Sequence, residues 1–236
     1  MQLAPHLHRL GNDMVATYLI DTPQGITLVD AGFPGHYRDL ENEIASLGKQ
    51  FSDIKGLILT HGDCDHIGFA ERLRSEHGVP VYVHAADAEQ ARTGDRPKPS
   101  TGRMRVGPVV AFLAYALRKD GIRARPVQEV VEITDGDVLP LPGDPVIIGM
   151  PGHSPGSIAI HVSVADAVMV GDAFITRHLL TGRRGPQPAP FSQDSAEAAA
   201  SLERIVDLDT SWVLPAHGAP WHGSPADAVA AARAAS

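Results

Sequence analysis

The chain has 236 residues, 43% of them hydrophobic and 20% charged, which is typical of a globular protein that can bury a sizeable core. Its 28 acidic and 20 basic residues give a net charge of -8, which argues against nucleic acid as a partner because such binding depends on clustered Lys and Arg. The single cysteine excludes an intrachain disulfide. Neither a signal peptide nor a run of roughly 20 apolar residues is present, so we expect a cytoplasmic protein with no membrane partner.

The first third of the sequence alternates between strand and helix patterns, which indicates an α/β organisation. It begins with two apolar runs joined by turn residues, which predict a hairpin. Apolar residues at helical spacing, ending at Gly48, predict the first helix. We predict strands at residues 14–21, 25–32, 54–61 and 79–87, and helices at residues 36–48 and 67–78.

The second half repeats this style after an interruption. Residues 92–127 begin with a polar stretch rich in Gly and Pro and continue as an apolar helix-like run. This segment is too short for a core of its own, so we predict one domain over residues 1–236 with a lid insertion at 92–127. A surface helix or a homodimer contact is the alternative. Beyond it we predict four strands, at residues 145–154, 157–163, 166–174 and 211–218. We also predict two helices, at residues 195–208 and 224–235.

Four potential metal ligands fall within six positions after the apolar run at residues 57–59. His61, Asp63, Asp65 and His66 are the side chains concerned, in the stretch LILTHGDCDHIG. Imidazole and carboxylate are the usual protein ligands of zinc and other divalent metals. This stretch by itself is either a polar loop rich in Asp and His or one half of a metal site.

Three further candidates, His153, Asp172 and His217, also follow apolar strands. Open α/β folds place their chemistry beyond the carboxyl ends of such strands. Seven candidate ligands at four strand ends therefore favour a metal site over a polar loop. The remaining histidines are isolated in the sequence, and we interpret them as solvated or structural: His6, His8, His36, His77, His84, His161, His178 and His222.

This pattern resembles the metallo-β-lactamase superfamily. Its signature is a His-x-His-x-Asp-His cluster, a His within Gly-His-Thr/Ser-Pro-Gly, a Gly-Asp pair and a final Gly-His or similar. The matching segments THGDCDHIG, PGHSPGS, VGDAF and LPAHGAPW occur in the same order and cover nearly the whole chain. The resemblance implies an α/β (α+β) fold, a four-layer αββα sandwich whose halves pack sheet to sheet, with the metals at one edge.

The resemblance also implies roles for the candidate ligands. A first metal would be held by His61, Asp63 and His153, and a second by Asp65, His66 and His217. Asp172 would bridge them together with a hydroxide that serves as nucleophile, and Asp65 would have a catalytic part in orienting it or carrying protons. The implied cofactor is two divalent metal ions, zinc in the first place, with manganese or iron as alternatives.

Position 63 departs from the family pattern, because Asp63 stands where the family has His. With two divalent ions and a bridging hydroxide, the three carboxylates bring the site to about zero net charge, where the usual ligand set leaves about +1. Such an oxygen-rich site should be a weaker Lewis acid and tolerate harder metals beside zinc. The alternative is that Asp63 binds no metal and that the first site is weak or empty.

Two neighbouring residues are assigned supporting parts. Cys64 lies between two candidate ligands, and because adjacent side chains in a tight loop diverge, we expect it to be a small buried filler, not a ligand or nucleophile. Asp30 matches a position that the family usually fills with Asp, and we expect it to orient a ligand by contact with that side chain without binding the metal itself.

The superfamily resemblance implies a metal-dependent hydrolase of a small molecule. We expect a small carbonyl substrate, namely a lactone, thioester or other ester, ahead of a β-lactam. The alternative is an iron-containing redox protein or a non-hydrolytic metal-binding protein of the same fold, since a carboxylate at the second ligand position also occurs in an oxygen-reducing branch. The residues that bind substrate are not identified by the sequence.

Overall fold

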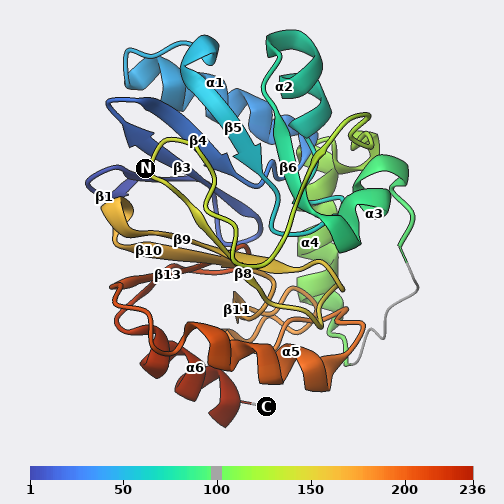
Figure 1. The fold of residues 1–236 in the computed structure, drawn as a ribbon. Coiled ribbons are helices and arrows are strands. Elements are labelled where there is room, and N and C mark those ends of the chain that lie inside the picture. The colour runs from blue at the N-terminus through green and yellow to red at the C-terminus, as the bar shows by residue number, and fades with distance from the viewer. Residues whose placement is uncertain (97–102, 236) are drawn as a thin grey trace.

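Two β-sheets lie face to face with helices on both outer sides, in a computed structural model that describes residues 1–96 and 103–235 (Figure 1). The predicted insertion at 92–127 thus lies partly outside the described residues. Helices α1 and α2 cover the outer face of one sheet, and α5 and α6 that of the other. This arrangement confirms the expected four-layer αββα sandwich. Within the described part of the chain, no helix is long and apolar enough to cross a membrane.

The first sheet follows the chain in order, from β1 to β7. Its first four strands pair antiparallel and include the predicted hairpin, whereas the pairs from β4 to β7 are parallel. The strands are β1 (Gln2–Ala4), β2 (Leu7–Gly11), β3 (Ala16–Thr22), β4 (Gly25–Val29), β5 (Ile54–Ile58), β6 (Val81–His84) and β7 (Val131–Ile133). The outer helices are α1 (Tyr37–Ser46), α2 (Ala70–His77) and α3 (Ala88–Thr93).

The second sheet has the order β14-β13-β10-β9-β8, in which β10 and β13 are parallel. Its strands are β8 (Val146–Gly149), β9 (Ile158–Val162), β10 (Ala167–Gly171), β13 (Trp212–Pro215) and β14 (Trp221–His222). A separate ribbon consists of β11 (Ile175–Arg177) and β12 (Arg184–Gln187), and the outer helices are α5 (Ser195–Ser201) and α6 (Pro225–Ala234). Single 3-10 turns occur at η1 (Pro34–His36), η2 (Phe51–Asp53), η3 (Ala85–Asp87), η4 (Gly121–Arg123), η5 (Ser163–Ala165) and η6 (Leu202–Ile205).

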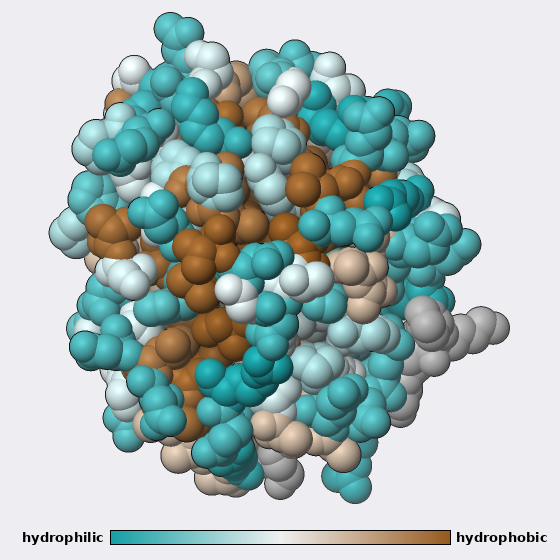
Figure 2. Space-filling model, in the orientation of Figure 1, coloured by the Kyte–Doolittle hydropathy of each residue, from teal (hydrophilic) through white to brown (hydrophobic). Residues whose placement is uncertain are grey.

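The layered core explains why the strands read as continuous apolar runs. Successive side chains of a strand point to opposite faces, and here both faces are covered. In and just after β5, Leu57 and Leu59 pack toward the outer helices, while Ile58 packs between the sheets. In β10, Met169 faces the first sheet and Val168 the side of α6. Figure 2 shows hydrophilic residues over much of the surface, with hydrophobic residues in patches that run down the middle of this view across both halves of the sandwich.

Helix α4 (Val106–Arg118) is the main element of the insertion and has no buried residue. Hydrogen bonds and an ion pair between Lys119 and Asp39 hold its C-terminal part against the first half of the sandwich. The backbone N–H of Gly35 donates to the carbonyl of Lys119 at 2.9 Å, and the His36 ring hydrogen-bonds the Tyr115 hydroxyl at 2.7 Å. Burial, followed by the charge of Lys119, lowers the pKa of His36 to about 4, so its ring is neutral at pH 7. At the other end of the helix, the Arg105 N–H donates to the carbonyl of Leu180 at 2.8 Å. The helix is therefore held at both ends while much of its apolar surface stays uncovered.

Gly68 permits a close crossing of backbone segments just before α2. Its N–H donates to the carbonyl of Gly32 at 2.8 Å, and a Cβ at this position would collide with that carbonyl and with the backbone of Phe33. Because rigid backbone cannot move aside, we predict that Gly68→Ala lowers the free energy of unfolding by about 1–3 kcal/mol. Chemical denaturation measures this, and Gly107→Ala in α4 is the control, since a Cβ there meets nothing within 4 Å. Equal stability of Gly68→Ala and the parent would contradict the prediction.

Candidate metal centre

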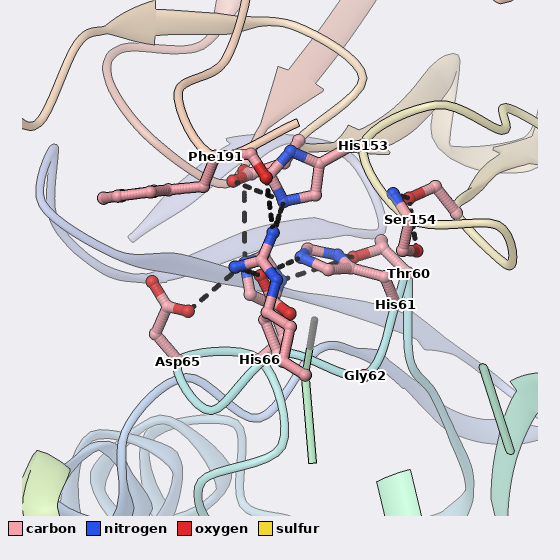
Figure 3. Close-up of polar contacts among 12 residues, drawn as sticks. Thr60, His61, Gly62, Asp65, His66, His153, Ser154 and Phe191 are labelled. Carbon is pink, nitrogen blue, oxygen red and sulfur yellow. Dashed lines mark hydrogen bonds and ion pairs between the residues drawn. The ribbon is translucent and has the colours of Figure 1, made fainter. Parts of the chain in front are cut away.

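The seven candidate ligands lie at one edge of the sandwich, on loops that leave both sheets. His61, Asp63, Asp65 and His66 are on the loop between β5 and α2. From the other sheet, His153 follows β8, Asp172 comes directly after β10, and His217 follows β13. Figure 3 shows the side chains of His61 and His153 pointing toward a common centre, with Asp65 on the opposite side. The structure therefore brings together every residue that the sequence singled out as a ligand.

Backbone contacts between the two sheets fix how these loops meet. The N–H of Ile158, at the start of β9, donates to the carbonyl of Thr60 at 2.9 Å. The Tyr18 hydroxyl donates to the carbonyl of Pro215 at 2.7 Å and so anchors the segment that leads to His217. Gly171 precedes Asp172 with φ +51°, and a Cβ there would lie 2.6 Å from the Thr60 hydroxyl oxygen. Glycine at this position thus allows the two ligand loops to approach each other.

The potential ligand atoms fall into three groups, each within 4.8 Å: His61, Asp63 and His153; Asp65, His66 and His217; and His61, His66 and Asp172. In the first group, Asp63 Oδ2 is 3.4 Å from the Nε2 atoms of both His61 and His153. In the second, His217 Nε2 is 3.5 Å from Asp65 Oδ2. Asp172 Oδ2 lies between the groups, 3.3 Å from His217 Nε2 and 3.7 Å from His153 Nε2.

Each of the four imidazoles is held through Nδ1, which leaves Nε2 facing the centre. His66 Nδ1 donates to Asp30 Oδ2 at 2.9 Å, and His217 Nδ1 donates to the carbonyl of Met14 at 2.6 Å. His61 Nδ1 lies 3.1 Å from the Thr60 hydroxyl, and His153 Nδ1 lies 3.3 Å from that of Ser192. Hydrogen bonding at one ring nitrogen orients the other toward a metal. Asp30 also accepts from the Thr60 N–H at 2.8 Å, which fits the orienting part expected of it.

Unpartnered polar atoms at the centre match the needs of a metal ion. His61 Nε2, His66 Nε2 and Asp172 Oδ1 are buried and have no hydrogen-bond partner among the described residues. Buried polar atoms without partners are costly and rare in native proteins. Two ligands at about 2.1 Å from a tetrahedral zinc ion are about 3.4 Å apart, close to the separations in these groups. The residues present therefore fit divalent metal in number, chemistry and spacing.

The electrostatics of the cluster also favour cations. Burial lowers the pKa of His66, but Asp30, followed by Asp65 and Asp172, outweighs this and raises the pKa to about 10. Burial raises the pKa of Asp172, but the charge and hydrogen bond of His217 help to bring this pKa well below its usual range. Metal binding at this centre must therefore displace protons from imidazole.

Three residues that the sequence analysis did not identify contact the ligand loops. Asp87, at the end of η3, is 1% exposed and accepts from the Gly62 N–H at 3.0 Å, the Gly156 N–H and the Ser154 hydroxyl, both at 2.7 Å. It thereby connects the loops that carry His61 and His153. The sequence feature that could have pointed to Asp87 is its place at the end of the apolar run 79–87. Gln90 Nε2 donates to Asp63 Oδ1 at 2.7 Å, and Arg96 forms an ion pair with the same carboxylate.

The expectation that Cys64 is a buried filler is wrong, because its side chain is exposed in the wall of a cavity. Asp63 and Asp65 turn inward, so the side chain between them points away from the ligand atoms. Partial loss of water around the thiol, together with the charges of Asp65 and Asp63, raises its pKa to about 12. Cys64 is therefore a protonated thiol at neutral pH, which argues against a part as nucleophile.

A cavity of about 570 Å³ opens directly over the candidate ligands. Asp63, Asp65, His153, Asp172 and His217 form its floor. Its walls are mostly apolar and come from α4, η4 and the β12–α5 connection: Phe112, Leu113, Ala116, Leu117, Ile122, Pro190 and Phe191. A second depression of about 620 Å³, lined by Arg9, Asp13 and Arg118 among others, contains none of the ligands. The chemistry and the apolar walls thus share one cavity.

A four-layer αββα sandwich with a His and Asp cluster at its edge defines the class of metallo-β-lactamase-like proteins. The model of the metallo-β-lactamase superfamily matches residues 10–217, and the chain belongs to this superfamily. Membership supports a metal-dependent hydrolase in general terms.

Relatives of this chain are consistent with that assignment. The chain is 30% identical over 235 residues to the probable metallo-hydrolase YflN of Bacillus subtilis, covering 94% of this chain and 87% of that protein. It is 31% identical to the probable metallo-hydrolase YqgX of the same organism, covering 72% of this chain and 73% of that protein.

Among solved structures, the metallo-β-lactamase family protein TTHA1429 of Thermus thermophilus has a TM-score of 0.69 at 23% identity, covering 96% of this chain and 78% of that one. The Rm3 metallo-β-lactamase has a TM-score of 0.71 at 19% identity, covering 99% and 90%. These structural likenesses show the fold.

Asp87 allows a test of how the ligand loops are held together. Removing its carboxylate leaves the Gly62 and Gly156 N–H groups and the Ser154 hydroxyl without their acceptor in a buried place. We predict that Asp87→Ala lowers the free energy of unfolding by at least about 2 kcal/mol and weakens metal binding. Chemical denaturation and metal titration measure the two effects. Exposed Asp209 provides the control variant Asp209→Ala, and an Asp87→Ala protein that matched it in both measurements would contradict the prediction.

Proposed function

We propose that the protein is a hydrolase of a small carbonyl compound, a lactone, thioester or other ester ahead of a β-lactam, that works with two divalent metal ions. The observation that carries this proposal is the pair of three-residue ligand groups that meet at Asp172. Two such groups with a shared carboxylate suit two ions side by side. Zinc is the first choice because of the four imidazoles, with manganese or iron as alternatives.

Each group would hold one ion. His61, Asp63 and His153 would bind the first, and Asp65, His66 and His217 the second, with Asp172 between them. Bound metal of this kind supplies a hydroxide nucleophile at neutral pH and polarises the substrate carbonyl. Asp30 and the carbonyl of Met14 fix the rings of His66 and His217 so that their Nε2 atoms stay directed at the centre.

Asp65 is the residue that we propose for proton transfer. Its side chain is 14% exposed, whereas that of Asp172 is 7% exposed, so Asp65 has the better access to the cavity and to water. Its Oδ2 is 3.5 Å from His217 Nε2, which keeps the carboxylate beside the reacting groups. A carboxylate in this place can orient the attacking water and pass its proton to the leaving group.

The cavity walls support a substrate with an apolar part. The polar floor would receive the carbonyl group, while Leu113, Leu117 and Ile122 offer hydrocarbon surface above it. These side chains are 55%, 62% and 83% exposed, so they are available to a ligand. Binding pockets for small molecules combine such apolar walls with a few convergent polar groups. An ester, thioester or lactone with a hydrocarbon chain meets both requirements.

An iron-containing redox protein is the second candidate, and Asp63 is the observation in its favour. A carboxylate in place of an imidazole makes the first ligand group richer in oxygen, which suits harder metals. Metal analysis combined with an absorption spectrum separates the two candidates, because iron centres are coloured and zinc is not. Iron together with no turnover on lactone, thioester, phosphodiester and β-lactam substrates would favour the redox candidate.

The two-metal arrangement makes a direct prediction about metal content. At saturating zinc we expect about two ions per chain, the number that two groups of ligands can hold. Asp172→Ala should reduce occupancy of both positions and abolish turnover, because Asp172 contacts both groups. Elemental analysis and assays with an ester and a lactone measure these effects. Asp209→Ala serves as the control, and fewer than about half an ion per chain in the parent would refute the metal centre.

The apolar walls make a separate prediction about substrate preference. Leu117 lines the cavity, whereas Val110 lies on the same helix outside it. We predict that Leu117→Ser raises the KM for a long-chain ester about tenfold, the loss expected for one buried hydrocarbon side chain, and leaves that for acetate esters unchanged. Val110→Ser should change neither. If Leu117→Ser altered the sedimentation of the protein but not this preference, α4 would be a subunit contact and not part of the substrate site.

A further inference from the structure

Arg96 reaches into the first of the two ligand groups. It follows α3 by three residues, and its side chain is 22% exposed. Nη1 forms an ion pair with Asp63 Oδ2, and Nη2 lies 3.3 Å from His153 Nε2. Nη2 also donates to the backbone carbonyl of Phe191 at 2.8 Å, which fixes the direction of the guanidinium. Among the described residues, Arg96 forms no hydrogen bond or ion pair with the second group, Asp65, His66 and His217.

The atoms that Arg96 contacts are the atoms that would bind the first metal. Asp63 Oδ2 and His153 Nε2 belong to that ligand group and are 3.4 Å apart. A guanidinium has only donors, so it occupies lone pairs that a metal would otherwise use. It also carries a permanent positive charge, which repels a divalent cation at short range. Arg96 and the first metal therefore exclude each other from the same place.

We propose that Arg96 competes with metal for Asp63 and His153, so that the first metal position binds metal more weakly than the second. This inference rests on the two-metal arrangement proposed above and adds an order of loading to it. The second position fills while Arg96 remains on Asp63. The first position fills only when the guanidinium withdraws and gives up its contacts with Asp63 and Phe191.

The charge at position 63 explains why an arginine belongs here. His61 Nε2, His153 Nε2 and Arg96 Nη1 all face the Asp63 carboxylate, and only the guanidinium carries a permanent positive charge. The side chain of Asp63 is only 7% exposed, so its negative charge needs a partner whenever the first metal is absent. Arg96 provides that partner, and it would have no such carboxylate to pair with if position 63 were histidine.

A zinc titration against a chromophoric chelator tests the competition. For the parent protein we expect one tight and one weaker zinc position. Arg96→Ala should tighten the weaker one by about 10- to 100-fold, the size of effect that changes around metal ligands have, and leave the tight one unchanged. Arg96→Gln should act in the same way, because the amide is polar but carries no charge and ends two bonds short of the guanidinium nitrogens. Arg92→Ala is the matched control, since Arg92 pairs with Glu132 at the surface at 2.7 Å.

The possible results separate this inference from the proposed function. Two zinc positions in the parent with unchanged affinities in both Arg96 variants would overturn the competition and leave the two-metal proposal standing. Weaker binding in these variants would also overturn it, because Arg96 would then support the metal. A parent that bound no zinc at saturation would refute both. In Asp63→His, where the guanidinium loses its carboxylate, adding Arg96→Ala should change the weaker affinity much less than it does in the parent.

Discussion

Three carboxylates, Asp63, Asp65 and Asp172, are drawn together at one edge of the sandwich, and the surrounding structure has to compensate their charge. Burial of so many anions is tolerated only where cations or hydrogen-bond donors face them. Here four imidazoles, one guanidinium and the proposed metal ions share that task. The anchoring of each ring through Nδ1 follows from this need, because a ring that turned away would leave a carboxylate without its partner.

Much of the fold could be predicted because the strands are covered on both faces. Continuous apolar runs revealed β3 to β6, β8 to β10 and β13, and helix-like patterns revealed α1, α2, α4, α5 and α6, although α5 ends at Ser201 and continues as the 3-10 turn η6. The shorter elements escaped prediction for a physical reason. Strands such as β7 and β14 have two or three residues, so they carry no period that a sequence can display, and they exist because a neighbouring strand offers unpaired backbone groups.

The candidate ligands could be predicted because their chemistry is carried by residue type and by position after a strand. Residues that act through tertiary contacts could not. Arg96 lies in a polar stretch rich in Gly and Pro, where nothing marks one arginine among several, and its relation to Asp63 exists only once α3 is packed. Asp87 did follow an apolar strand, but its three hydrogen bonds join segments far apart in the sequence. The outward direction of Cys64 likewise depends on how the cavity opens beside it.

The division of the ligands between the two sheets has a mechanical consequence. Each of the three groups takes at least one member from the β5–α2 loop and at least one from the second half of the chain. Any ion held there forms a reversible cross-link between the two halves of the sandwich. Because such an ion binds only the assembled sandwich, its binding energy adds to the resistance against separation of the sheets. Chelation should thus first increase the mobility of the ligand loops beside the cavity. Amide hydrogen exchange in these loops should therefore speed up on metal loss before exchange in the distant strands does.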